Sequence, residues 1–150
     1  MLLRIGEIVA PIKYTIESPF IEVEKMVSLK IEKKFGLILK KLKMNYHLDF
    51  AGFKNEEIKI FGEIKVRSHN YGKYPTVMVS AYKFLGLKQI LQTFNKPVFL
   101  FIQYNDGLYY WRFNIEDKYT LRWGGRTDRN SHKDIEPMAH FPIRYFKELK

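Results

Sequence analysis

Glu-x-Lys tripeptides recur along this chain, and a carboxylate and an ammonium group at this spacing can do hydrolytic chemistry. In a β-strand, residues two apart point to the same face, so the two side chains can share one ligand. The carboxylate can bind a hard cation, and the pair can orient a nucleophilic water. The candidate pairs are Glu32/Lys34, Glu57/Lys59, Glu63/Lys65 and Glu148/Lys150.

Two of these pairs lie where the chemistry is disfavoured. Glu32/Lys34 falls in a predicted helix, where residues two apart do not face each other. Glu148/Lys150 is at the end of the sequence, where chains often fray. The remaining pairs, Glu57/Lys59 and Glu63/Lys65, share one predicted strand and one face of it.

Asp49 favours the second of these pairs. The polar segment 54–56 predicts a turn between two antiparallel strands, and counting back from it places Asp49 opposite about residue 61. Asp49 is then within one or two positions of Glu63, whereas Glu57/Lys59 lies further toward the turn. We therefore expect Asp49, Glu63 and Lys65 to converge.

The elements that must position these residues follow from hydrophobic spacing and stop signals. Ser18 and Pro19 predict the start of a helix that runs to about Phe35, with Val27 near the centre of its buried face. A basic stretch follows it. A second helix is expected over 81–95. The predicted strands cover about 47–53, 57–67, 76–80, 97–104 and 108–113.

The predicted fold class is α/β, bordering on α+β, with a central mixed β-sheet flanked by helices in the order α-β-β-β-α-β-β. Along 57–67, the residues from Ile58 to Val66 alternate, so Ile58, Ile60 and Ile64 are expected on one face. Glu63 and Lys65 are expected on the other face.

We expect a single domain over 1–150, because no linker or repeat divides the chain. Its core is about 18–113, preceded by an N-terminal arm over 1–17. Residues 114–150 form a basic loop and C-terminal extension, in which 122–134 is predicted as a loop and a segment near 139–143 returns to the sheet. The basic residues that could make this loop a DNA-binding flap are Arg122, Arg126, Arg129 and Lys133.

Composition limits the possible functions. The 150 residues include 26 Lys and Arg against 16 Asp and Glu, a formal net charge of +10. Such a charge favours a polyanion such as nucleic acid, or an anionic membrane. The absence of cysteine excludes a disulfide scaffold, thiolate metal sites and a thiol nucleophile. No apolar run approaches a membrane helix, so we expect an intracellular, cytoplasmic domain without a membrane partner.

A family resemblance rests on these residues. An acid on a strand after a helix, a hairpin to Glu-x-Lys, and then a strand and a second helix resemble the PD-(D/E)XK nuclease superfamily. Within it, the chain looks most like the archaeal Holliday junction resolvases and small virus-encoded nucleases. The matching segments are HLDFAG (47–52), GEIKVR (62–67) and KPVFLFIQYNDGLYYWRF (96–113), and Leu48 stands where the family name has proline.

The family also places a glutamate on the first helix, and Glu22 and Glu24 compete for that role. At about 100° per residue, Glu24 falls roughly 60° from the centre of the apolar arc and Glu22 roughly 140° from it. Glu24 also precedes Asp49 by a spacing that resembles the resolvases. We therefore assign the role to Glu24.

The resemblance implies a Mg²⁺-dependent DNA endonuclease, for which Mn²⁺ substitutes. Asp49, Glu63 and the backbone carbonyl of Ile64 would hold the metal, with Glu24 assisting. Lys65 would orient the attacking water and stabilise charge in the transition state. Branched DNA is a candidate substrate, and a homodimer is expected by analogy with the resolvases. The residues expected to contact DNA are Arg67, His69, Lys73, Tyr74 and Lys83.

Less specific interpretations stay open at this point. Asp49 could be an acid at a strand end, and Glu63/Lys65 could be an exposed salt bridge that contributes little to stability. The alternative function is a non-catalytic nucleic-acid-binding module of the same fold. A third is an assembly protein with a dispersed positive surface.

Overall fold

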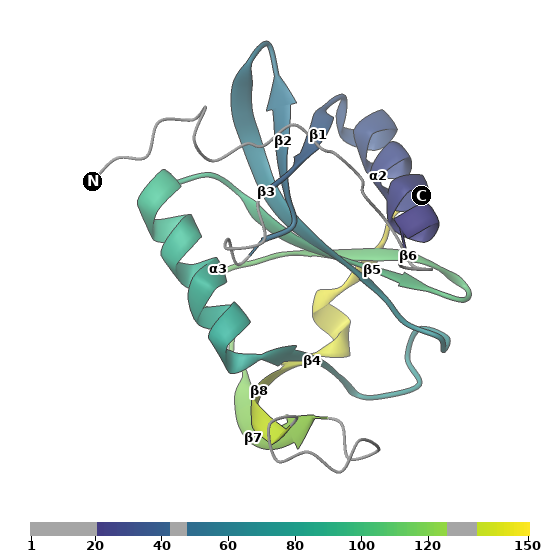
Figure 1. The fold of residues 1–150 in the computed structure, drawn as a ribbon. Coiled ribbons are helices and arrows are strands. Elements are labelled where there is room, and N and C mark those ends of the chain that lie inside the picture. Colours follow the sequence, from purple (N-terminus) through teal and green to yellow (C-terminus); the bar gives the residue numbers. More distant parts are fainter. Residues whose placement is uncertain (1–20, 43–47, 126–134) are drawn as a thin grey trace.

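The computed structural model describes residues 21–42, 48–125 and 135–150, and they form a central six-stranded sheet with one helix on each face (Figure 1). The strand order is β1-β2-β3-β5-β6-β9. The predicted arm at 1–17 and the helix start at Ser18 and Pro19 lie outside the described residues. The strands of this sheet are β1 (Ile38–Lys41), β2 (Phe50–Lys54), β3 (Glu57–Val66), β5 (Val98–Tyr104), β6 (Gly107–Arg112) and β9 (Lys147–Glu148).

The sheet is mixed, as predicted. β3 and β5 pair in parallel, and all other neighbours in the sheet pair antiparallel. A parallel pair needs a crossover connection. Here the crossover contains β4 (Thr76–Ser80) and helix α3 (Ala81–Phe94).

A second, three-stranded sheet was not predicted. It has the order β4-β8-β7, with β7 at Thr120–Gly125 and β8 at Ile135–Pro142. Residues 76–80 therefore do not join the central sheet, and the first part of the predicted loop 122–134 is a strand. The segment near 139–143 does return to a sheet, but to this one. β7 was not predicted because its apolar alternation is limited to Leu121 and Trp123, and the basic, glycine-containing residues that follow are typical of a loop.

Helix α2 (Ile21–Phe35) packs against one face of the central sheet. Val27 and Ile31 are buried there, and burial of such side chains contributes roughly 1.5–3 kcal/mol each. The helix ends at Gly36, whose φ of 65° suits the left-handed conformation. The basic stretch after it contains β1, which was not predicted. Leu39 is buried in this strand between exposed neighbours, so the strand has an alternation too short to stand out.

Helix α3 packs on the opposite face. Phe84 and Leu87 are buried, and Leu91 and Phe94 pack at the edge of the same core. Residues 98, 100 and 102 of β5 join the α3 core, whereas 99 and 101 join the α2 core. This division is what the period of two in a covered strand requires.

A β-bulge in β3 changes which residues face each helix. Gly52 pairs with Ile60 but Phe53 pairs with Ile58, so Lys59 is an extra residue. Ile58 therefore joins the α3 core, while Ile60 and Ile64 join the α2 core. The prediction that Ile58 shares a face with Ile60 is wrong, because strict alternation assumes an unbroken strand.

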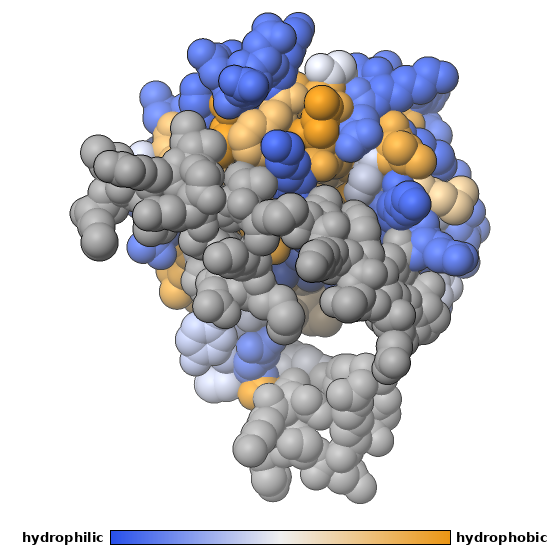
Figure 2. Space-filling view, turned by 45° about the horizontal axis from the view of Figure 1, so that its top comes forward, coloured by the Kyte–Doolittle hydropathy of each residue, from blue (hydrophilic) through white to orange (hydrophobic). Residues whose placement is uncertain are grey.

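On the face shown in Figure 2, hydrophilic side chains surround a hydrophobic area near the top of the view, and smaller hydrophobic areas lie elsewhere on the described surface. No helix in the described ranges is both long enough and apolar enough to cross a membrane.

Candidate active site

The β2–β3 register brings Asp49 next to Glu63. Phe50 pairs with Gly62, so Asp49, directly before β2, is level with Glu63. Counting back from the turn had placed it opposite about residue 61, and the bulge accounts for part of the difference. The Ile64 backbone N–H donates a hydrogen bond to Asp49 Oδ2 at 3.2 Å, which holds the two strands together at this point.

Glu63 is a buried acid held by two lysines. It is only 1% exposed, so it is no exposed salt-bridge partner. Its Oε1 atom lies 3.0 Å from Lys65 Nζ and 2.8 Å from Lys83 Nζ. Its Oε2 atom is buried and has no hydrogen-bond partner among the described residues. A buried charge is costly unless it is paired, so the lysines explain one oxygen and leave the other unexplained.

Asp49 is electrostatically coupled to this acid. Burial is the main cause that raises the pKa of Asp49, and the negative charge of Glu63 raises it further. The charge of Lys83 and the hydrogen bond from Ile64 lower the pKa of Asp49, but the net shift is upward. Two neighbouring carboxylates are typical of a cation-binding site, because their negative charges repel each other unless a cation neutralises them.

Glu24 lies at the edge of this cluster. Its charge also contributes to the raised pKa of Asp49, and its carboxylate lies 3.7 Å from Lys41 Nζ of β1. Glu24 is half-buried, whereas Glu22 is exposed. Among the described residues, no three His, Cys, Asp or Glu side chains are grouped closely enough to hold a metal ion together. The geometry therefore centres on two carboxylates, with Glu24 outside their immediate group.

The rival pair is on the surface. Glu57 and Lys59 form an exposed ion pair at the turn end of β3, as expected of a solvated salt bridge. Glu148 and Lys150 pair at 3.8 Å, at the edge of the sheet.

Three of the predicted DNA-contact residues line one groove of about 330 Å³ at the end of β3. These are Arg67, His69 and Tyr74. Lys73 lies in the adjacent exposed turn, with its ammonium 5.5 Å from the Tyr74 ring centre. Lys83 lies outside this groove, in helix α3, where its ammonium group pairs with Glu63.

The second sheet supplies the other wall of this groove, including Arg122 and His140. Burial lowers the pKa of His140, and the charge of Arg122 lowers it further. Arg122 had been noted as part of a basic segment, and its companions Arg126, Arg129 and Lys133 lie outside the described residues. His140 carries no local signal in the sequence, because its place depends on the pairing of β4 with β8.

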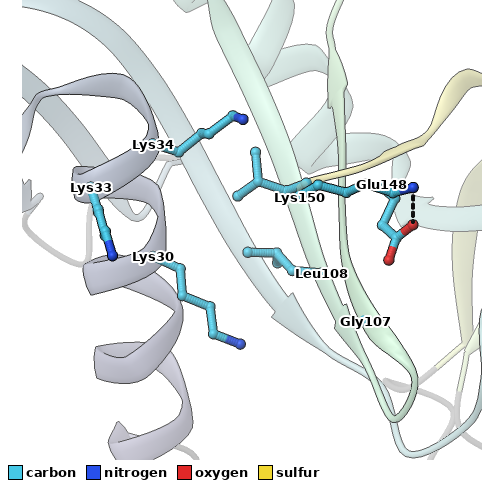
Figure 3. A pocket seen from close by; sticks show the side chains of 8 residues that line it. Lys30, Lys33, Lys34, Gly107, Leu108, Glu148 and Lys150 are labelled. Atoms are coloured by element: carbon cyan, nitrogen blue, oxygen red, sulfur yellow. Dashed lines mark ion pairs between the residues drawn. The ribbon is translucent and has the colours of Figure 1, made fainter.

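A second basic hollow of about 540 Å³ lies between α2 and the edge of the central sheet (Figure 3). Lys30 and Lys34 extend from α2 toward the strands, and Lys33 belongs to the same turn of helix. Lys150 and its ion-pair partner Glu148 lie on the opposite side. We call this hollow the lysine groove.

Comparison with a solved structure identifies the class of fold. The chain is similar to a solved structure of Hjc, a Holliday junction resolvase of the archaeal hyperthermophile Archaeoglobus fulgidus. The TM-score is 0.57 at 13% sequence identity, over 88% of this chain and 93% of that chain. The likeness confirms the restriction-endonuclease-like fold.

Sequence comparison identifies the family. Residues 13–149 match the family described as "Phage putative PDDEXK endonuclease", and the chain belongs to that family. The predicted PD-(D/E)XK resemblance is thereby confirmed. No curated protein sequence matches the chain.

Proposed function

We propose that this protein is a Mg²⁺-dependent DNA endonuclease that hydrolyses phosphodiester bonds. The observation that carries the proposal is the buried Glu63 carboxylate, beside Asp49 and Lys65, with one oxygen that no described residue satisfies. Membership of a nuclease family supports the same conclusion.

The residues present fit a divalent metal. Asp49 and Glu63 supply hard oxygen ligands, and Mg²⁺ commonly uses one or two carboxylates together with substrate phosphate oxygens. In a strand, the N–H and C=O of one residue point to the same neighbour. Because the Ile64 N–H points to Asp49, the Ile64 carbonyl points to the same side of the strand. This carbonyl is the proposed third ligand. Bound Mg²⁺ supplies Lewis-acid polarisation of the phosphate and a lowered pKa of a water ligand.

The side chains around these ligands have separate roles. Lys65 orients the attacking water and stabilises negative charge on the phosphate in the transition state. Its position 3.0 Å from Glu63 keeps the ammonium beside the ligand set. Glu24 assists through a water, consistent with its place outside the two-carboxylate group.

DNA is the proposed substrate, held by the groove that contains Arg67, His69 and Tyr74. Contacts from such residues to phosphates position the strand without reading its sequence. Branched DNA is the proposed preference, because the similar archaeal structure is a Holliday junction resolvase.

The test is cleavage of linear, single-stranded, flap and four-way junction DNA with Mg²⁺, Mn²⁺ or EDTA. Asp49→Asn and Lys65→Met are expected to slow cleavage by about 100-fold or more, because each removes a group that acts on the reacting phosphate. The matched control is Glu57→Gln with Lys59→Met, the same tripeptide at the exposed end of the same strand. It is expected to cleave at the wild-type rate.

Two outcomes contradict the proposal. Equal cleavage by Asp49→Asn and wild type would reveal a contaminating nuclease. Tight, salt-sensitive DNA binding without any metal-dependent cleavage would identify a binding module instead. The expected homodimer stays a prediction, and sedimentation velocity measures it directly.

A further inference from the structure

The proposed nuclease chemistry does not explain the placement of Lys83, which lies beside the Asp49 and Glu63 carboxylates. The family resemblance implied DNA contact for this residue, yet its ammonium lies 2.8 Å from the buried Oε1 atom of Glu63. Lys65 already satisfies that atom at 3.0 Å. The cluster therefore contains a second lysine, from a different element.

The position of Lys83 in its helix is unfavourable by itself. It lies in the first turn of α3, which holds no acidic residue, and Ser80 makes no side-chain capping bond. A positive charge near a helix N-terminus opposes the helix dipole. Lys83 is only 31% exposed, so solvent screens this repulsion incompletely. The compensating interaction is the ion pair with Glu63.

Charge balance indicates what the second lysine does. Asp49 and Glu63 carry up to two negative charges, and Lys65 and Lys83 carry two positive charges. Lys83 also acts on Asp49, because its charge lowers the pKa of that carboxyl. Without a metal, the two lysines thus neutralise the two carboxylates. A divalent cation would bring a second pair of positive charges into the same small volume.

We propose that Lys83 is a resident counter-ion that orients the Glu63 carboxylate before the metal arrives, and that competes electrostatically with metal binding. This inference rests on the proposed metal-dependent function. Lys83 is a positioning residue, since it acts through Glu63. It holds Oε1, which leaves the unpartnered Oε2 atom of Glu63 for the incoming cation.

The experiment measures Mg²⁺ binding to the DNA-free protein by calorimetry for wild type, Lys83→Met and Lys83→Arg. Removing one positive charge near the ligands is expected to tighten Mg²⁺ binding by roughly tenfold. Lys83→Arg retains the charge and should bind Mg²⁺ like wild type. The matched control is Lys88→Met, which removes a lysine of the same helix that lies over the Phe84 and Tyr119 rings. It should leave the affinity unchanged.

Thermal unfolding gives a second readout. Lys83→Met leaves a buried carboxylate with one fewer partner, so its midpoint without metal should fall, and saturating Mg²⁺ should raise it more than in wild type. If Lys83→Met fails to fold, adding Glu63→Gln should recover the midpoint of Glu63→Gln alone. Failure to recover would show that Lys83 acts elsewhere and would overturn the inference.

The outcomes separate this inference from the proposed function. Equal or weaker Mg²⁺ binding by Lys83→Met overturns the counter-ion role, even if wild type cleaves DNA as proposed. Absence of any Asp49-dependent Mg²⁺ binding in wild type overturns both. A lysine that only stabilised the helix packing would lower the midpoint without tightening the metal affinity.

Discussion

At the scale of single residues, the cluster around Glu63 lowers the stability of the fold, because it places two carboxylates close together and away from solvent. The charge of Glu63 helps to raise the pKa of Asp49, and Glu63 itself is buried away from solvent. Groups of this kind are commonly retained for function although they destabilise the fold. The cost in folding stability is greatest when no metal ion is bound to the two carboxylates.

The first prediction is that Asp49→Asn stabilises the protein in the absence of metal. The folded state raises the pKa of Asp49 above its ordinary value of 3.8, so the folded state holds the proton more strongly than the unfolded chain. Stability is therefore lost as pH rises from 3.8 through the raised pKa. Asparagine avoids this loss and can still accept the Ile64 hydrogen bond.

The measurement is the unfolding midpoint against pH in EDTA. Asp49→Asn should exceed wild type near neutral pH, and the two should converge as the pH falls toward 3.8. Mg²⁺ should raise the midpoint of wild type and not that of the variant. A variant less stable than wild type at neutral pH would contradict the assigned sign.

At the scale of elements, the β2–β3 hairpin sets the distance between Asp49 and Glu63. Its two-residue turn places Asn55 at φ 51° and Glu56 at φ 63°. Tight hairpins with both central residues at positive φ favour Asn-Gly, and a glutamate there is strained. The bulge at Lys59 then shifts the register so that Asp49 comes level with Glu63.

The second prediction concerns this turn. Glu56→Gly should stabilise the protein by about 1 kcal/mol, a rise of roughly 2–4 °C in the unfolding midpoint, because glycine adopts positive φ without steric cost. Thermal unfolding measures the gain. The matched control Lys54→Gly, at a strand position without positive φ, should destabilise. Cleavage by Glu56→Gly should stay at the wild-type rate, and a lower midpoint would argue against the assigned turn.

At the scale of the whole molecule, two hollows of the described surface are lined by basic side chains. One is the groove at the end of β3, and the other is the lysine groove (Figure 3). Lys33 follows Glu24 along α2 by about 14 Å at 1.5 Å per residue. We expect DNA bound at the active site to extend to the lysine groove.

The third prediction is that Lys30→Glu with Lys33→Glu weakens DNA binding by at least about tenfold at low salt, and reduces the salt dependence of binding, because two phosphate contacts are lost. The matched control is Lys54→Glu with Lys96→Glu, which makes the same charge change at exposed positions outside both hollows. Fluorescence anisotropy at several salt concentrations measures both. Equal losses in the two double variants would indicate a dispersed positive surface instead.

Local information was sufficient for the main elements and for the proximity of Asp49 to Glu63. The periodicity of α2 and α3, the hairpin and the Glu-x-Lys spacing act over a few residues, so they are visible without the fold. They predicted the mixed sheet with a helix on each face, and they favoured Glu63/Lys65 over the pair at Glu57/Lys59. Asp49 could be placed near Glu63 because a short hairpin leaves little freedom of register.

Long-range packing accounts for what the spacing could not reveal. The bulge that moves Ile58 to the other face, and the pairing of β4 with β8 and β7, depend on strands that compete for partners across the chain. The same holds for Lys83, which reaches Glu63 from helix α3 within the crossover between β3 and β5. Burial of Glu63 could not be read from a strand of alternating charge, because the cost of burying its carboxylate is offset only when lysines from two elements meet it in the folded molecule.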